Sequence, residues 1–384
     1  MRRARADRRR SRCSGRGPYP VRRMGRLALV HDYLLVLRGA ERTFAAMSEV
    51  WPDAPIVTLV YDEEGTERRF AGRAIRTSPL QPFGAQQDRF RAFLPAFPTA
   101  ARRLHLEEFD LVVSSSSAFA HGVRKRRGAT HVCYCHTPFR QAWHEQARAL
   151  ASVPRPLRPT LRLLLRRHRA FDRRAVRDVD EYVANSQITR ERIRRFWGRD
   201  AQVVHPPVDV ARFWIGPAGD YVLFVGELVG HKRAHVAIEA AMAAGRHIKV
   251  VGAGPELRRL RARYNGAADF LGRVSNVDLA RLYAGASALV VPNVEEFGIA
   301  AVEAQAAGRP VVALDAGGAR ETVIAGRTGL LVPPDDPTAL ARALRDDLTR
   351  FDPQDIRAHA QRFSRETFQA RLRDIVEAAS KRRP

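Results

Sequence analysis

Short apolar runs alternate with stretches of helical periodicity along almost the whole chain. Near the start, residues 27–31 and 56–61 are apolar runs of strand length, and residues 39–51 between them have apolar positions at helical spacing. Strands that alternate with helices favour parallel sheets covered by helices on both faces. Because the alternation stops once and then restarts, we predict an α/β fold of two Rossmann-like domains that face each other across a cleft.

Further elements of the predicted first domain continue this pattern. Two helices rich in Arg are expected at residues 88–103 and 161–177. The remaining strands are expected at residues 110–114, 131–135 and 181–184. The last of these strands ends at Asn185 and Ser186, two polar residues that suit the N-cap of a following helix.

A segment rich in Pro and Gly interrupts the alternation. Residues 205–219 contain three Pro and two Gly, so we interpret them as an interdomain linker. The pattern restarts with an apolar run at 221–225, and residues 365–379 have the periodicity of an amphipathic helix that we expect to return to the first domain. The predicted boundaries are a disordered Arg-rich tail 1–25, a first domain 26–204, a linker 205–219, a second domain 220–364 and a C-terminal helix 365–384.

The charge of the chain is unusual. With 66 Lys and Arg against 41 Asp and Glu, the formal net charge is +25, which favours anionic partners such as nucleic acid, acidic lipid or phosphorylated substrates. Residues 1–23 hold ten Arg, one Asp and no apolar stretch, so we expect them to be disordered. A start of translation at Met24 and a genuine basic tail are equally consistent with the sequence.

Nothing in the sequence predicts insertion into a membrane. No run approaches the roughly 18 apolar residues of a membrane span, and the doublet Arg9-Arg10 is not followed by the apolar region of a signal peptide. We therefore expect a cytoplasmic protein. Cys133 and Cys135 stand two apart in an apolar run and are interpreted as buried reduced thiols, and we expect no metal site.

Residues that directly follow a strand are the first candidates for a site, because open parallel sheets bind ligands beyond the carboxyl ends of their strands. Residues 295–303 follow the apolar run 288–291, and a helix is expected from about Phe297 to Ala307 with Gly308 as its C-cap. The segment therefore joins a strand to a helix start at the predicted cleft.

The start of that helix offers groups that bind ligands. Its first turn has free backbone N–H groups and a partial positive charge, which favour an anion or sugar hydroxyls. Gly298 lets a ligand approach the backbone closely, and Glu303 can accept two hydrogen bonds from a vicinal diol. By periodicity alone, an acidic helix cap with one solvated Glu is the commoner alternative.

Two further turns between a strand and a helix contain Gly and basic residues. The turn at 226–233 places Lys232 at a helix start, where a point charge supported by the helix dipole suits a diphosphate. The alternative is an ordinary surface Lys. The turn at 252–255, which begins with Gly252, resembles part of a dinucleotide fingerprint on the strength of two Gly.

The first half supplies candidates for the opposite side of the cleft. His136 stands just past a predicted strand, although a lone His is more often structural than catalytic. Gly39 follows the first strand and its loop, where it either lets phosphate approach or makes a turn. Residues 178–180 have the form of a D-x-D metal motif but lie before a strand, so we do not interpret them as a metal site.

Together these motifs resemble the family-four retaining glycosyltransferases, whose GT-B fold has two Rossmann-like domains. Residues 295–303 are similar to the E-x7-E motif of that family, and its other landmarks are matched in order at 230–233, 250–257, 270–274, 304–310 and 317–321. In the first half, residues 31–33, 38–41, 133–138 and 184–186 resemble a bacterial subgroup of mannosyltransferases that assemble surface polysaccharides. The resemblance covers about residues 26–380.

The resemblance implies a role for each matching residue. Lys232 would bind the diphosphate of a nucleotide-sugar donor, Glu303 would hold the ribose hydroxyls and Glu295 would contact the transferred sugar. From the opposite domain, His136 would face the donor sugar and Gly39 would lie near the diphosphate. His136, Lys232 and Glu295 are the catalytic residues that follow from this comparison.

The resemblance also implies a set of donor-binding positions and a donor class. Besides Gly39 and Glu303, these positions are Gly252, Arg273, Val274, Phe297, Gly298 and Ile299. The amides from 297 to 299 would contact sugar hydroxyls or phosphate, and residues 273–274 would border the base. The expected reaction moves a hexose, with mannose favoured, to a glycan or lipid-linked glycan without a metal. GDP-mannose is the favoured donor, and a UDP-sugar is the alternative.

Two positions depart from the family pattern. The family commonly has an Arg five residues before the Lys, and this chain has Glu227 there. A carboxylate beside a diphosphate repels it unless the side chain points away, and His231 or Arg233 can supply the missing charge. The Gly pair expected near residue 39 is Gly39-Ala40.

Other functions remain open at this stage. A nucleotide-sugar 2-epimerase or a phosphorylase can use the same fold, because fold does not fix reaction. The positive charge would also suit a nucleic-acid-binding protein, but no groove-reading helix or interleaved aromatic pattern is present. The basic helices expected at 88–103 and 161–177 suggest peripheral contact with an anionic inner membrane surface near a lipid-linked acceptor.

Overall fold

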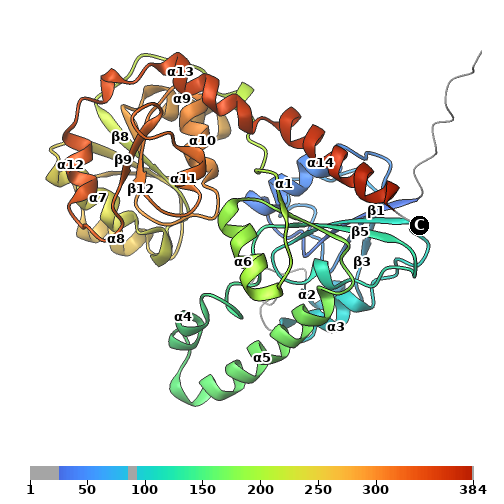
Figure 1. Cartoon of the computed structure of the whole chain (residues 1–384). Coiled ribbons are helices and arrows are strands. Elements are labelled where there is room, and N and C mark those ends of the chain that lie inside the picture. Colours follow the sequence, from blue (N-terminus) through green and yellow to red (C-terminus); the bar gives the residue numbers. More distant parts are fainter. Residues whose placement is uncertain (1–25, 85–92, 383–384) are drawn as a thin grey trace, which may run out of the picture.

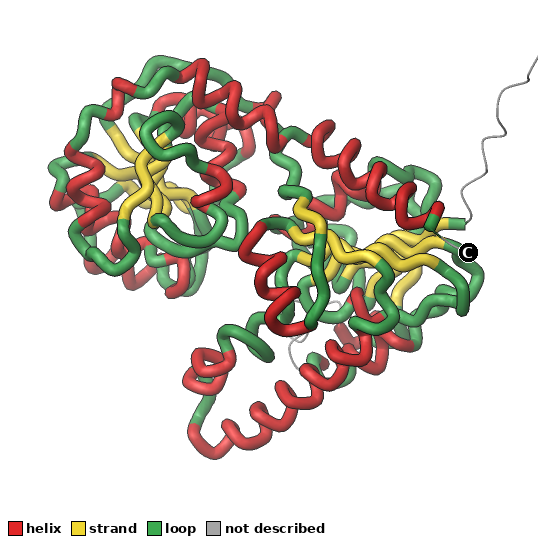
Figure 2. Tube along the Cα trace, in the orientation of Figure 1, coloured by secondary structure: helices red, strands yellow, loops and turns green. Residues whose placement is uncertain are grey.

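The computed structural model describes residues 26–84 and 93–382. Two α/β domains lie beside each other, each with a parallel sheet between layers of helices (Figure 1). The tube in Figure 2 shows the two sheets as separate bodies, joined by the linker and by the C-terminal helix that runs from one domain to the other. The predicted pair of Rossmann-like domains is confirmed.

The sheet of the first domain has the strand order β3-β2-β1-β4-β5-β6-β7, and every pairing in it is parallel. Its strands are β1 (Leu27–His31), β2 (Ile56–Thr58), β3 (Ile75–Thr77), β4 (Leu111–Ser116), β5 (Thr130–Cys135), β6 (Glu181–Ala184) and β7 (Gln202–Val203). The central strands are buried along their whole length, as expected for a sheet covered on both faces. The order reverses between β1 and β4, which is where such sheets form a ligand crevice.

Helices cover both faces of this sheet. They are α1 (Gly39–Ser48), α2 (Gln81–Gly84), α3 (Phe97–Arg102), α4 (Gln146–Ala151), α5 (Arg158–Ala175) and α6 (Gln187–Trp197). Ser186 caps α6, because its side chain accepts a hydrogen bond from the Thr189 backbone N–H. Helices α4 and α5 project from the body of the domain (Figure 1). Cys133 and Cys135 are buried free cysteines on β5, in agreement with their interpretation as thiols.

The second domain repeats the architecture with the strand order β10-β9-β8-β11-β12-β13, again parallel throughout. Its strands are β8 (Tyr221–Val225), β9 (His247–Val251), β10 (Asp269–Gly272), β11 (Ala288–Val291), β12 (Val311–Leu314) and β13 (Gly329–Val332). Its helices are α7 (Ala234–Ala243), α8 (Leu257–Arg263), α9 (Asn276–Gly285), α10 (Ile299–Ala306), α11 (Ala319–Thr322), α12 (Ala339–Arg345) and α13 (Pro353–Ala360). The order reverses between β8 and β11, so the loops after these strands form the second crevice.

The last helix belongs to the first domain. Helix α14 (Arg365–Lys381) begins at the N-cap Ser364 and crosses from the second domain to α1 and β5 (Figure 1). Its apolar face buries Phe368, Leu372 and Val376 in the same core cluster as Phe44 of α1. The expected return of this helix is therefore confirmed.

Two expectations for the first domain have other outcomes. A single long helix at 88–103 is wrong for the described part, where residues 94–96 form turns and α3 is the only α-helix. Residues 88–92 of that prediction, and the whole disordered tail predicted at 1–25, lie outside the described residues. Pro98 near the start of α3 explains the boundary, because Pro is tolerated only in the first turn of a helix.

Candidate active site

The start of α10 is built by a glycine and an anchored aromatic ring. Gly298 is the N-cap of α10, with φ +92°, a backbone conformation that favours glycine. The Phe297 side chain is 3% exposed and stacks on His205, with ring centroids 5.4 Å apart. The Phe297 side chain therefore belongs to the core, and only its backbone remains for a ligand. The first turn of α10 leaves backbone N–H groups without intrahelical partners at the carboxyl end of β11.

Glu303 lies one turn farther along α10 and is buried. One carboxylate oxygen accepts from Nη2 of Arg212 at 2.8 Å, and the other accepts from the Tyr283 hydroxyl at 3.0 Å. Burial raises the pKa of Glu303, and the charge of Arg212 opposes that rise. A carboxylate has about four acceptor positions, so these two bonds orient Glu303 and leave capacity for ligand hydroxyls.

Lys232 and Glu295 form a direct ion pair. Lys232 ends the short turn η5 (Gly230–Lys232) after β8, and Glu295 follows β11. Nζ of Lys232 donates to both carboxylate oxygens of Glu295, at 2.6 and 2.8 Å, and Nδ2 of Asn293 donates to the first of these at 2.8 Å. Two predicted catalytic side chains thus meet at the switch point between β8 and β11.

Gly252 has a structural reason to be glycine. Its φ is +138°, and a β-carbon at this position would stand 1.9 Å from the carbonyl oxygen of Gly226. The loops after β8 and β9 can therefore pack together only if residue 252 has no side chain. Of the pair predicted to border the base, Arg273 is exposed just after β10, whereas Val274 packs partly against the second-domain core.

His136 lies in a buried hydrogen-bonded chain at the carboxyl end of β5. Its Nε2 is 2.8 Å from the Ser115 hydroxyl, which is 3.1 Å from Nδ1 of His31. Burial, followed by the charge of Arg140, lowers the pKa of His136 to about 4. The imidazole is therefore neutral at pH 7 and can contribute hydrogen bonds rather than positive charge.

Gly39 touches the second domain. A β-carbon on Gly39 would stand 3.3 Å from Cδ1 of Ile299, the first residue of α10. Gly39 is also the first residue of α1, so the N-terminal ends of α1 and α10 face each other across the cleft. Both residues are predicted donor-binding positions, and the fold brings them into contact from different domains.

The ion pairs that follow cross the cleft with the same arrangement of charge. Nη2 of Arg38, beside Gly39, lies 3.5 Å from Oε1 of Glu227. Arg140 and Arg192 of the first domain meet the Glu296 carboxylate at 3.3 and 2.9 Å. Burial raises the pKa of Glu296, but the two arginines outweigh burial and hold that pKa below its ordinary value. In each of these pairs, the cation comes from the first domain.

Glu321 adds a helix cap to this interface. Its two carboxylate oxygens accept from the backbone N–H of Gln187, the first residue of α6, at 2.8 and 2.9 Å. Nε2 of His205 in the linker lies 2.9 Å from one of them. An acidic side chain of the second domain therefore stabilises the start of a first-domain helix.

Several residues of this site have no distinguishing sequence signal. Arg212 and Tyr283 orient Glu303 but lie in the linker and on α9, outside every motif. Glu296 stands inside the 295–303 motif, where its neighbour Glu295 drew attention instead. Pairing across the cleft depends on the placement of whole domains, which periodicity does not reveal.

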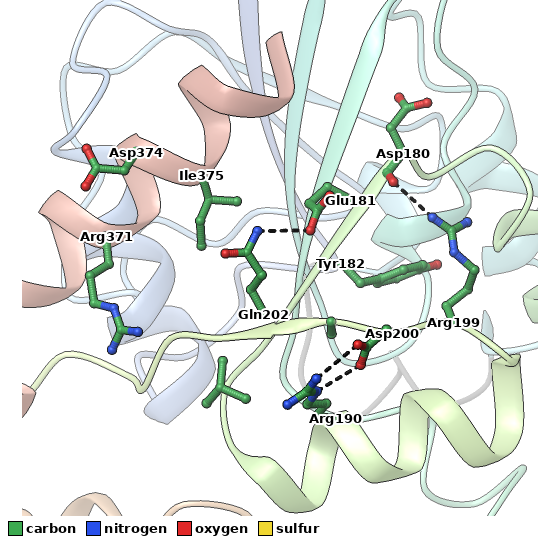
Figure 3. Close-up of a pocket in the computed structure, with 12 residues that line it drawn as sticks. Asp180, Glu181, Tyr182, Arg190, Arg199, Asp200, Gln202, Arg371, Asp374 and Ile375 are labelled. Carbon is green, nitrogen blue, oxygen red and sulfur yellow. Dashed lines mark hydrogen bonds and ion pairs between the residues drawn. The ribbon is translucent and has the colours of Figure 1, made fainter. Parts of the chain in front are cut away.

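A separate depression of about 700 Å³ lies away from these residues, between β6, β7 and α14 (Figure 3). Among its polar side chains, Arg190 pairs with Asp200 at 2.8 and 3.0 Å, and Gln202 pairs with Glu181 at 3.1 Å. In the part of the chain that the structure describes, no group of His, Cys, Asp and Glu is arranged to hold a metal ion. The candidate site lies in the cleft, where Arg38, Arg140 and Lys232 are cationic side chains.

The fold is shared with solved glycosyltransferase structures. HepE from Anabaena, solved with UDP, superposes with a TM-score of 0.68 at 19% identity, covering 91% of this chain and 100% of that one. Sucrose-phosphate synthase from Thermosynechococcus elongatus gives 0.68 at 18% identity, covering 91% and 98%. The two parallel-sheet domains and these structural neighbours identify the fold of this chain as GT-B.

Two family models match the chain on either side of the linker. Residues 37–212 match "Glycosyltransferase Family 4", and residues 219–350 match "Glycosyl transferases group 1". Each half of the chain therefore matches a glycosyltransferase family model, which agrees with the class of enzyme expected from its motifs.

Curated relatives have several different activities. D-inositol 3-phosphate glycosyltransferase of Streptomyces scabiei is 34% identical over 53% of this chain and 55% of its own length. D-rhamnosyltransferase WbpZ of Pseudomonas aeruginosa is 30% identical over 48% of this chain and 54% of its own length. The chain spans about half the length of these relatives, and their names do not single out mannose.

Proposed function

We propose that this chain is a retaining glycosyltransferase that moves a hexose from a nucleoside diphosphate sugar to a glycan or lipid-linked glycan. The observation that carries the proposal is the direct contact of Lys232 with Glu295 beside the N-terminal end of α10. This arrangement offers a cation and free backbone N–H groups to the leaving diphosphate, where negative charge grows in the transition state.

Each remaining group has a part in the proposed reaction. Glu303 accepts hydrogen bonds from the ribose hydroxyls, in an orientation fixed by Arg212 and Tyr283. His136, neutral and held by Ser115, faces the transferred sugar from the first domain. Closure of the two domains over the donor excludes water and limits hydrolysis. The positive groups that meet the diphosphate are protein side chains, so the proposed chemistry uses no metal.

The donor is proposed to be GDP-mannose, with a UDP-sugar as the competing candidate. GDP-mannose is supported by the first-domain motifs, whereas solved neighbours of the same fold contain UDP or UDP-glucose. A thermal-shift screen of GDP-, UDP- and ADP-sugars decides between them, since a ligand that binds only the folded protein raises its melting temperature. The proposed acceptor belongs to surface polysaccharide synthesis.

The transferase proposal is tested by Lys232→Ala and Glu303→Ala, assayed for release of nucleoside diphosphate with and without a glycan acceptor. We expect both variants to lose most of the transfer activity. Lys232→Ala removes a hydrogen-bond donor and a positive charge from the transition state, which costs roughly 100-fold or more, and Glu303→Ala removes the acceptor of the ribose hydroxyls. Lys381→Ala, an exposed Lys at the end of α14, is the matched control. Near-normal turnover in both site variants contradicts the assignment, and release without acceptor favours a nucleotide-sugar 2-epimerase, which eliminates the nucleoside diphosphate, over a transferase.

We further propose cytoplasmic peripheral docking on an anionic membrane surface through α5. In the segment that projects with α4 and α5, Leu157 and Leu163 are 56% and 50% exposed, and Arg162, Arg166 and Arg167 beside them are exposed. Apolar side chains among arginines suit the headgroup region of an acidic bilayer. No helix of the described residues is long and apolar enough to cross a membrane.

Vesicle co-sedimentation tests this docking. Wild type is expected to bind vesicles that contain phosphatidylglycerol and to bind neutral phosphatidylcholine vesicles much less. Replacing Arg162, Arg166 and Arg167 by Gln removes that difference, whereas replacing Arg173 and Arg174, exposed at the other end of α5, retains it. Equal binding of wild type to both vesicles overturns the docking proposal.

A further inference from the structure

The ion pair between Arg38 and Glu227 joins the two domains at the rim of the candidate site. Arg38 is the N-cap of α1, and Glu227 lies in the loop between β8 and η5. The side chains are 59% and 43% exposed, and their charged atoms are 3.5 Å apart. Exposed ion pairs contribute only about 0–1 kcal/mol, so a bound anion can displace the Glu227 carboxylate from Arg38 at small cost.

The backbone of Arg38 is fixed although its side chain is exposed. Its N–H donates to Oε2 of Glu41 at 3.0 Å, which anchors the first turn of α1. The next residue, Gly39, abuts Ile299 at the start of α10. Arg38 is therefore held in place beside the α10 N-terminus, while its long side chain can reorient.

Glu227 belongs to the same short loop as Lys232. The carbonyl oxygen of Glu227 accepts from the Val229 N–H at 2.9 Å, and the carbonyl oxygen of Val229 accepts from the Lys232 N–H at 2.9 Å. These bonds fold the loop so that a guanidinium bound to Glu227 is close to the proposed diphosphate position. A negative Glu227 without a cation would repel that diphosphate.

Lys232 alone supplies limited positive charge for a diphosphate. Its ammonium group is already bound to both oxygens of Glu295 at 2.6 and 2.8 Å. Arginine offers a planar fork of donors that binds phosphate oxygens in pairs. At this rim, Arg38 pairs with an exposed carboxylate, so its guanidinium can supply such a fork to the diphosphate.

We propose that Arg38 binds the donor diphosphate from the first domain. Before the donor binds, Glu227 holds the Arg38 guanidinium, and the diphosphate then takes the place of the Glu227 carboxylate. This inference rests on the proposed function and deepens it. When Arg38 moves from Glu227 to the diphosphate, the diphosphate is bound by Arg38 of the first domain and by Lys232 of the second. Donor binding then holds the cleft closed through the ligand itself, and Glu227 turns to solvent.

The competing explanation is that the pair only braces the two domains. A brace is symmetric, because losing either partner breaks the same bond. If Arg38 binds phosphate and Glu227 only competes for it, the two losses have different effects. Loss of Arg38 weakens donor binding, whereas loss of Glu227 removes a competitor and a repulsive charge. The two singles and the double variant therefore separate the explanations.

The experiment measures the dissociation constants of UDP, GDP and ADP, and of their monophosphates, by titration calorimetry. For the diphosphate that wild type binds tightest, Arg38→Gln is expected to weaken binding roughly 10- to 100-fold, the value of a charge-assisted hydrogen bond. Glu227→Gln is expected to bind more tightly than wild type. The double variant is expected to bind more weakly than Glu227→Gln, because it lacks the cation, but more tightly than Arg38→Gln, because it also lacks the unpaired carboxylate. The loss should be much smaller for the monophosphate, which lacks the second phosphate group.

Arg263→Gln is the matched control, because Arg263 pairs with Glu239 at 2.9 Å on α7 and α8 and is similarly exposed. It is expected to bind every nucleotide as wild type does, and melting curves check that all variants fold. Equal weakening by Arg38→Gln and Glu227→Gln, or no weakening by Arg38→Gln, overturns the Arg38 proposal. Failure of wild type to bind any of the nucleotides overturns the proposed function instead.

Discussion

Gly39 of the first domain lies against Ile299 of the second, so closely that a β-carbon on Gly39 would stand 3.3 Å from Cδ1 of Ile299. The contact joins the first turns of α1 and α10, which are also the two helix starts that face the proposed diphosphate. Domain closure is therefore sensitive to the volume of a side chain at residue 39.

Gly39→Val is expected to lower kcat/KM for transfer roughly tenfold or more, because overpacking a close contact costs about 1–3 kcal/mol. Gly39→Ala is expected to have a much smaller effect, since the Ile299 side chain can move by a few tenths of an ångström. The double variant Gly39→Val/Ile299→Ala should recover activity because it restores the space. A double variant that remains as slow as Gly39→Val would show that the contact does not set closure.

Arg212→Ala is expected to shift the pH dependence of nucleotide binding to higher pH. The groups that face Glu303 are Arg212, Tyr283 and, by its charge, Arg42 of α1. Burial raises the pKa of Glu303 and Arg212 opposes that rise, so loss of Arg212 moves the pKa higher. Protonation removes an acceptor for the ribose hydroxyls, so affinity should fall as pH decreases.

The measurement for Arg212→Ala is the nucleotide dissociation constant over a series of pH values from acidic to alkaline, beside wild type and Arg212→Lys. Affinity of Arg212→Ala should decline at a higher pH than that of wild type, with Arg212→Lys in between because it retains a charge. Parallel curves for the three proteins would show that Arg212 does not act through the ionisation of Glu303.

Glu41→Gln is expected to change how stability depends on pH. Burial, the largest effect, raises the pKa of Glu41 from its ordinary 4.5 to about 7 despite the bond from the Arg38 N–H. The folded protein therefore binds a proton that the unfolded chain releases between these values. Stability from this group is present below pH 4.5 and is lost as pH rises through about 7.

Urea unfolding of wild type and Glu41→Gln at several pH values tests this expectation. The difference between the two free energies of unfolding should shift in favour of Glu41→Gln by a few kcal/mol between about pH 4.5 and about pH 7. The shift should then stay level at higher pH. A difference that is constant across the range would mean that Glu41 is not protonated in the fold.

Leu372→Ala is expected to destabilise the first domain although it lies near the end of the chain. Leu372 is 0% exposed in the first-domain core, and removing such a side chain costs about 2–5 kcal/mol. Arg373→Ala, on the exposed face of α14, is the control and should change stability little. The free energy of unfolding measures both, and equal effects would mean that α14 does not contribute to that core.

Most of the fold follows from hydrophobic pattern because the central strands are fully buried runs. The predicted strands at 27–31 and 181–184 have the bounds of β1 and β6. Strands β3 and β7 escaped prediction because they are short and partly exposed, so they carry little apolar signal. In the described part of the basic helix expected at 88–103, residues 94–96 form turns and the α-helix begins only at Phe97.

The candidate site was only half predictable. Lys232, Glu295 and Glu303 stand in local motifs at strand ends, so position along the chain identified them. Their partners were not identifiable, because Arg212 reaches Glu303 from 91 residues away and Arg38 reaches Glu227 from the other domain. Glu227 was noticed only as an unfavourable charge, and the structure supplies the cation that it meets.

The crossing of α14 has a consequence for how the protein is made. Ribosomes synthesise the chain from its N-terminus, and domains that are complete fold as they emerge. The second-domain sheet is complete at Val332, but the core of the first domain still lacks Phe368, Leu372 and Val376 at that stage. The domain that begins the chain is therefore the last to be finished, and nascent chains stopped before residue 365 carry an exposed apolar groove where α14 belongs.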